Sequence, residues 1–119
     1  MDDELAVDAL SALAHRHRLR VFRVLVKEGP PGLAAGEIGT RLGIAPSALS
    51  FHLAHLERAG LLRSWRHGRQ VRYAVEVDRM RGLLAFLTED CCNGQPEICG
   101  GLIAAAESYS DREKADERR

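Results

Sequence analysis

The spacing of apolar residues along the chain predicts a mainly helical protein. Apolar positions recur at helical spacing over residues 4–14, 16–28, 35–42, 46–58 and 78–90. The predicted core stripes are Leu5, Ala9, Ala12 and Leu13; Leu19, Phe22, Leu25 and Val26; Leu49, Leu53 and Leu56; and Met80, Leu83, Leu84 and Leu87. We place Pro46 at the first turn of the fourth helix and Gly60 just after its end. Residues 101–108 predict a short helix, and the charged segment 110–119 predicts disorder.

Two segments break the helical pattern and predict a β-hairpin. Residues 61–66 and 71–75 are rich in strand-forming side chains and are joined by the turn-like segment 67–70. Two short helices separated by a glycine-containing turn and followed by a hairpin form the order of a winged helix-turn-helix. We therefore predict a mainly α fold with a β-hairpin, in which helix 46–58 is the DNA-recognition helix. A plain helical bundle would leave the hairpin unexplained.

The recognition helix and the hairpin supply candidate DNA contacts. If Leu49, Leu53 and Leu56 face the core, the opposite side of the helix carries Ser47, Ser50, Phe51, Ala54 and Arg58. Serine can bond several base edges, phenylalanine can contact a thymine methyl group, and arginine can reach a phosphate. The hairpin adds Arg66, Arg69 and Arg72 along the flanking backbone, with Arg69 nearest the tip.

Net charge alone argues against a nucleic-acid partner, but the charge is unevenly distributed. The 119 residues carry 17 basic and 17 acidic side chains. Residues 15–28 and 61–81 each have an excess of four basic residues, while residues 1–10 and 88–107 each have an excess of four acidic ones. The window 63–72 holds four arginines and no acid, which is typical of a phosphate-binding surface.

The three cysteines of the chain, Cys91, Cys92 and Cys99, lie within nine residues directly after the last predicted long helix. Three thiolates with no histidine nearby favour a soft ion, and a three-coordinate centre such as As(III) or Sb(III) needs only three sulfurs. Zinc would need a fourth ligand, for which Glu97 or Asp90 could serve. Thiol oxidation, inert buried thiols and a catalytic cysteine are alternatives, although no histidine, arginine or lysine lies within the cluster to activate a thiol.

His52 and His55, which are helix neighbours, are better explained by a surface or packing role than by a metal site.

The order and spacing of several short segments resemble the ArsR/SmtB family of metal-responsive bacterial repressors over about residues 5–92. The segments are Ala48-Leu49-Ser50-Phe51-His52-Leu53, Leu56, Ala59-Gly60-Leu61-Leu62, Arg66-His67-Gly68-Arg69 and Tyr73. The resemblance implies homodimeric winged-helix repressors that pair through their first and fifth helices and leave the operator when an inducer binds. The cysteine pattern resembles the arsenite sensors of this family, whose site follows the fifth helix. Ala45 departs from the Ser or Thr that such proteins often carry at the start of the recognition helix.

These observations predict an As(III)-responsive, homodimeric transcriptional repressor, with a thiol-redox-sensing repressor as the alternative. Residues 1–92 would form the DNA-binding and dimerisation domain, 91–99 the sensor loop, and 100–119 a short helix and tail. The expected partners are operator DNA and a second copy of the chain, without an organic cofactor or an enzymatic activity. The absence of a long apolar run and of a basic leader predicts a cytoplasmic protein without a membrane partner.

Overall fold

The computed structural model describes residues 1–89, which contain five helices and a three-stranded sheet. The helices are α1 (Asp3–Leu13), α2 (Arg16–Glu28), α3 (Ala35–Leu42), α4 (Pro46–Arg58) and α5 (Val77–Thr88). The strands are β1 (Leu33–Ala34), β2 (Leu62–His67) and β3 (Gln70–Val75). The chain divides into two compact units, Met1–Phe86 and Leu87–Arg119. The predicted sensor loop 91–99 and the segment 100–119 lie outside the described residues.

Helices α2, α3 and α4 have the bounds that the sequence predicted. Helix α4 starts with Pro46 in its first turn and has no side-chain cap, because Ala45 offers no hydrogen-bond acceptor there. It ends before Gly60, whose φ of 79° is in the left-handed region that favours glycine. Helix α5 is slightly shorter than predicted and begins one residue earlier.

The sheet has the antiparallel order β1-β3-β2, and the hairpin β2–β3 forms the wing. Each wing strand has six residues, so only Gly68 and Arg69 separate them, and the predicted four-residue connection was too long. Strand β1 was not predicted because two residues carry no periodic pattern. It pairs Leu33 with Tyr73 and leads directly into α3.

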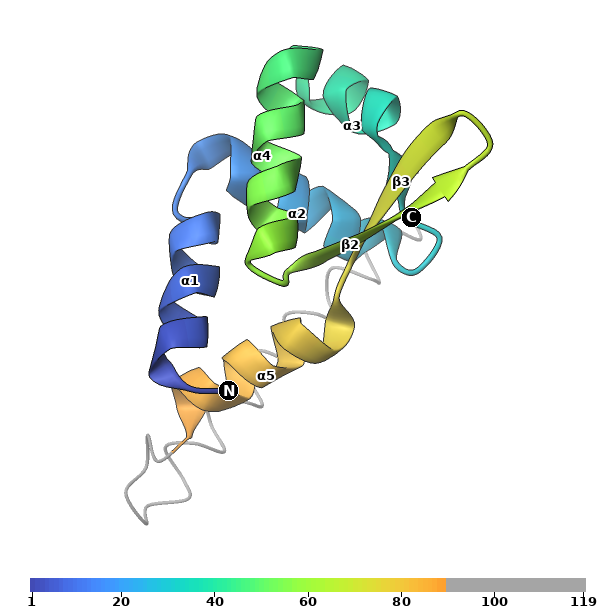
Figure 1. Ribbon diagram of the computed structural model, residues 1–119. Helices are drawn as coiled ribbons and strands as arrows, with labels where there is room; N and C mark the ends of the chain where they lie inside the picture. Colours follow the sequence, from blue (N-terminus) through green and yellow to red (C-terminus); the bar gives the residue numbers. More distant parts are fainter. Residues whose placement is uncertain (90–119) are drawn as a thin grey trace, which may run out of the picture. The chain divides into compact units, whose positions relative to one another are not determined.

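A single core joins the helices of the Met1–Phe86 unit to the base of the wing. Its fully buried larger side chains are Val21, Leu25, Leu33, Ile38, Leu53, Leu56 and Leu61. Helix α4 packs on α1, α2, α3 and β2, so the buried side of the predicted recognition helix is fixed by four other elements. In Figure 1, α3 and the start of α4 lie at the end of this unit toward which the wing also projects.

The predicted core stripes were only partly correct. Leu5, Leu19, Val26, Leu84 and Leu87 are exposed, with between 39% and 58% of their surface accessible. Helix α1 buries Ala6, Ala9 and Ala12, and helix α2 buries Arg18 and Val21 in addition to Phe22 and Leu25. The stripe Leu49, Leu53 and Leu56 of α4 is buried as predicted. On α1, α2 and α5 the apolar stripe is wider than the face that the rest of the chain covers, so spacing alone does not select the buried positions.

None of the helices among residues 1–89 combines the length and apolarity needed to cross a membrane.

Candidate nucleic-acid interface

The exposed face of α4 carries the side chains that the sequence assigned to DNA contact. Ser47, Ser50, Phe51 and Arg58 are exposed, as is Ala54, while Leu49, Leu53 and Leu56 are buried on the other side. Phe51 has 62% of its surface accessible, which is unusual for a phenylalanine. Small hydroxyl side chains around one exposed aromatic ring leave the helix narrow enough to enter a major groove.

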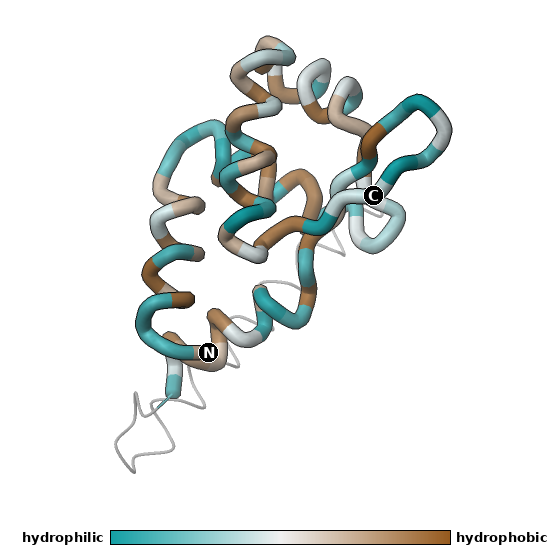
Figure 2. Tube along the Cα trace, in the orientation of Figure 1, coloured by the Kyte–Doolittle hydropathy of each residue, from teal (hydrophilic) through white to brown (hydrophobic). Residues whose placement is uncertain are grey.

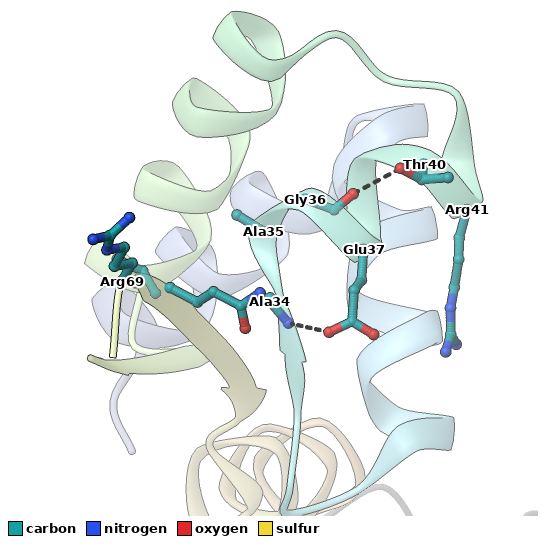
Figure 3. Close-up of a pocket in the computed structure, with 9 residues that line it drawn as sticks. Ala34, Ala35, Gly36, Glu37, Thr40, Arg41 and Arg69 are labelled. Carbon is teal, nitrogen blue, oxygen red and sulfur yellow. Dashed lines mark hydrogen bonds between the residues drawn. The ribbon is translucent and has the colours of Figure 1, made fainter. Parts of the chain in front are cut away.

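The wing presents two exposed arginines near its tip. Arg66 lies near the end of β2, and Arg69 lies in the two-residue loop with Gly68, so both guanidinium groups are available to phosphates. Figure 2 shows the tip of the wing as hydrophilic. Arg69 also lines an open hollow of about 760 Å³ that faces Ala35, Gly36 and Thr40 of α3 (Figure 3). The wing tip and the start of α3 therefore border one concave surface.

Arg72, the third predicted wing contact, has a different environment. Its Nε and Nη2 donate to the carbonyl oxygens of Pro31 and Gly32 at 3.3 and 2.9 Å, and Nη1 lies 3.7 Å from Glu37 Oε1. Glu37 in turn accepts a hydrogen bond from the Ala34 amide at 3.2 Å (Figure 3). These bonds tie the wing to the loop before α3, which favours a structural role for Arg72 over phosphate contact.

At Gly32 the loop before α3 passes very close to strand β3 of the wing. Its φ is 65°, and a Cβ at this position would lie only 2.2 Å from the carbonyl oxygen of Tyr73. A glycine is therefore required both by the backbone conformation and by the close approach of β3.

The base of the wing is held to α4 by contacts that the sequence did not reveal. Ser64 Oγ donates to Glu57 Oε1 of α4 at 2.6 Å, and the Arg63 guanidinium lies 4.8 Å from the Trp65 ring centroid. Burial, and secondarily the charge of Glu57, raises the pKa of Tyr73. Arg63, Ser64 and Trp65 were recognisable as strand residues. The Arg63–Trp65 contact lies within β2, whereas Ser64 meets Glu57 across the turn that follows α4.

His52 lies on the buried side of α4 beside the exposed Phe51. Its Nδ1 lies 3.3 Å from Nη1 of the buried Arg18, and its ring meets that of Phe51 edge-on with centroids 5.8 Å apart. His55 also packs edge-on to Phe51, at 6.5 Å. The packing role expected for these two histidines is thus observed, although the buried Arg18 was missed.

The predicted sensor residues Cys91, Cys92 and Cys99 lie outside the described residues. Within residues 1–89, no group of three or more His, Cys, Asp or Glu side chains is arranged to hold a metal ion.

A recognition helix supported by α3 and flanked by an arginine-bearing wing defines a winged helix-turn-helix DNA-binding protein. A family model described as a helix-turn-helix domain matches residues 13–64. The HTH-type transcriptional regulator YgaV of Escherichia coli is 33% identical over 89 residues, which are 75% of this chain and 88% of that protein. The chain belongs to the ArsR-like family of transcriptional regulators, and it is a DNA-binding regulator and not an enzyme.

Solved structures agree with this assignment. HlyU from Vibrio cholerae superposes with a TM-score of 0.58 at 36% identity, covering 73% of this chain and 97% of that one. A structure described as a possible transcriptional regulator for arsenical resistance superposes with a TM-score of 0.59 at 26% identity, covering 67% of this chain and 80% of that one.

Proposed function

We propose that this regulator is a homodimeric repressor that releases its operator when As(III) binds the thiolates of Cys91, Cys92 and Cys99. The observation that carries the proposal is the presence of three cysteines within nine residues directly after α5. Three sulfur donors without a fourth ligand suit a three-coordinate pyramidal As(III) or Sb(III) centre better than tetrahedral zinc.

The support from relatives is general. One solved relative is described as a possible regulator for arsenical resistance, whereas YgaV and HlyU carry no mention of arsenic in their names. The cysteine pattern of this chain therefore bears most of the argument for the inducer.

The dimer follows from the geometry of DNA recognition. One α4 helix reads only one half-site, and a two-fold dimer places two such helices in successive major grooves about 34–36 Å apart. Exposed apolar side chains on α1 and α5, including Leu5, Leu10 and Leu84, offer the surface for pairing. Arsenite and DNA are then coupled ligands, so each weakens the binding of the other by the same factor.

Fluorescence anisotropy on an inverted-repeat promoter duplex tests the proposal. Arsenite should weaken operator binding of the wild type, and Cys91→Ser, Cys92→Ser and Cys99→Ser should each remove the effect while leaving binding without arsenite unchanged. Because thiolates are the ligands, the arsenite effect should also decline at low pH. Wild-type DNA binding that ignores arsenite would exclude the sensor.

A peroxide arm separates the alternative, in which oxidation of neighbouring thiols provides the signal. If peroxide releases the operator and arsenite does not, and mass spectrometry shows the loss of two hydrogens on disulfide formation, the protein is a thiol-redox repressor.

A further inference from the structure

Four histidine and arginine side chains meet where the α1–α2 junction packs on the recognition helix. The ring centroids of His15 and His52 are 4.5 Å apart, those of His15 and His17 are 5.5 Å apart, and those of His17 and His52 are 5.6 Å apart. Arg18 is buried among them. We call His15, His17, His52 and Arg18 the junction cluster. Arg18 and His52 are buried, His17 is half-buried and His15 is exposed. Figure 1 shows α2 and α4, which carry or adjoin these residues, and α1, which contacts both helices.

The hydrogen bond between Arg18 and His52 fixes the protonation state of the histidine. A guanidinium group can only donate, so His52 Nδ1, at 3.3 Å from Arg18 Nη1, must accept and carry no proton. Arg18 Nε also donates to the Ala12 carbonyl oxygen at 2.6 Å, which holds the guanidinium in place. A proton on His52 Nδ1 would set two donors against each other in a buried site.

His15 is constrained in the same way. Its Nδ1 accepts a hydrogen bond from the His17 amide at 3.1 Å and thereby caps the start of α2. A cap requires a lone pair, so protonation of His15 at Nδ1 would remove the cap. The buried Nδ1 of His17 has no hydrogen-bond partner within the described part of the chain.

Protonation of a histidine would add positive charge beside that of Arg18, and no ion pair found among residues 1–89 compensates for it. Arg16 of α2 adds positive charge near His15, and His55 of α4 lies near His52, with Arg58 next to His55. Asp8 of α1 lines a hollow with His55 and Arg58, but none of the ion pairs found among residues 1–89 involves the cluster. Burial first, and then these positive neighbours, lower the pKa values of His15, His52 and His55.

The cluster is suited to protons and not to metals, because its rings are not arranged to hold an ion. We propose that the junction cluster is a proton-sensitive latch, in which neutral His15 and His52 hold α4 in its DNA-binding position and acidification weakens operator recognition. This goes beyond the arsenite response, since it involves neither the cysteines nor a soft ion.

The sign follows from linkage. Histidines whose folded pKa is lowered bind fewer protons in the native state than in the unfolded state. Their contribution to stability is present above the ordinary histidine pKa of about 6.5 and is lost as the pH falls through the folded values. A state with a displaced α4 gains the same protons, so operator binding should weaken over the same interval.

The chain offers a matched variant. The Oδ1 atom of asparagine takes nearly the position of histidine Nδ1 and accepts hydrogen bonds at any pH. Asparagine is also a good helix N-cap, so the His15→Asn/His52→Asn double variant keeps both acceptors and removes both titrations.

The test compares this variant with the wild type without arsenite, at constant ionic strength, on an inverted-repeat duplex recovered from random DNA and on a scrambled duplex. The ratio of the two affinities isolates recognition, because added positive charge strengthens non-specific binding to both duplexes. From pH 7.5 to 5.5 the wild-type ratio should fall several-fold, and the variant ratio less than about twofold.

A flat wild-type ratio, or an equal fall in the double variant, would overturn the proposal. NMR titration of the wild-type imidazole signals provides a test that does not depend on the variant folding. His15 and His52 should titrate below about 6.5, and a value at or above it for either ring would also refute the latch.

Discussion

At the scale of single residues, Arg69 and Arg72 of the wing show how the surroundings of an arginine decide whether it is available to DNA or stabilises the fold. Arg69 is exposed in the two-residue tip of the wing, whereas Arg72, three residues later, is bound to two carbonyl oxygens and lies near Glu37. Sequence alone gave both the same predicted role. The structure makes them a natural pair for mutation.

Replacement of Arg69 by alanine should weaken DNA binding without affecting the fold. Each lost phosphate contact reduces the slope of log K against log salt concentration by about 0.9, because fewer counterions are released. Anisotropy titrations at several salt concentrations measure that slope. Thermal unfolding should be nearly unchanged, since Arg69 makes no hydrogen bond or ion pair identified among residues 1–89.

Arg72→Ala is the matched control and should have the opposite signature. Loss of two charge-assisted bonds to the Pro31–Gly32 loop should lower the free energy of unfolding by about 1–2 kcal/mol, discounted because the side chain is partly exposed. Urea denaturation measures this. A slope unchanged in Arg69→Ala would remove the wing tip from the DNA interface.

At the scale of elements, the sequence predicted most helices because their limits are set by local signals. Pro46 and Gly60 define α4, and the run after Glu28 ends α2. Strand β1 and the short turn of the wing were missed because β1 exists only through its pairing with β3. Short non-local elements carry no pattern of their own.

The residues of the candidate site likewise fall into those that a local pattern predicts and those that depend on contacts distant in the sequence. The exposed positions of α4 follow from helical periodicity, so the exposure of Ser47, Ser50 and Phe51 was predicted correctly. Their contact with DNA stays a prediction. The buried Arg18 was not foreseen, because its partner His52 is 34 residues away and an arginine in a core is rare. Contacts of this kind depend on tertiary packing, which a single sequence does not encode in any local period.

The uncapped start of α4 leads to a prediction at this scale. Ala45 has φ and ψ of −62° and 145°, an extended conformation that suits an N-cap residue, but no side-chain acceptor. Ala45→Ser should let the serine hydroxyl accept from the Ala48 amide and raise the free energy of unfolding by about 0.5–1 kcal/mol. Urea denaturation measures the gain.

Ala54→Ser, in the exposed middle of the same helix, is the control. It adds the same hydroxyl group where no orphan amide needs it, so it should be neutral or slightly destabilising. Equal effects of the two variants would show that capping does not limit the stability of α4.

At the scale of the whole molecule, the formal charge of zero conceals a separation of functions along the chain. The basic excess lies on α2 and around the wing, while the acidic excess lies in the first ten residues and from residue 88 onward. A neutral sum keeps long-range attraction to DNA low, so specificity must come from two recognition helices acting together. The proposed dimer is therefore central to the affinity of the protein.

An exposed leucine of α5, Leu84, provides the test of that dimer. Leu84 has 58% of its surface accessible, and α5 approaches the start of α1 closely enough that a Cβ at Gly82 would lie 3.7 Å from Met1 Cε. Leu84→Glu should leave each chain folded, because the side chain is exposed, but it would bury an unpaired charge in the interface. Sedimentation equilibrium should then show monomers, and operator affinity should fall at least about tenfold as one half-site is lost.

Val26→Glu, an apolar position of α2 with 43% of its surface accessible, is the control and should remain dimeric. A Leu84→Glu protein that stays dimeric would place the interface elsewhere.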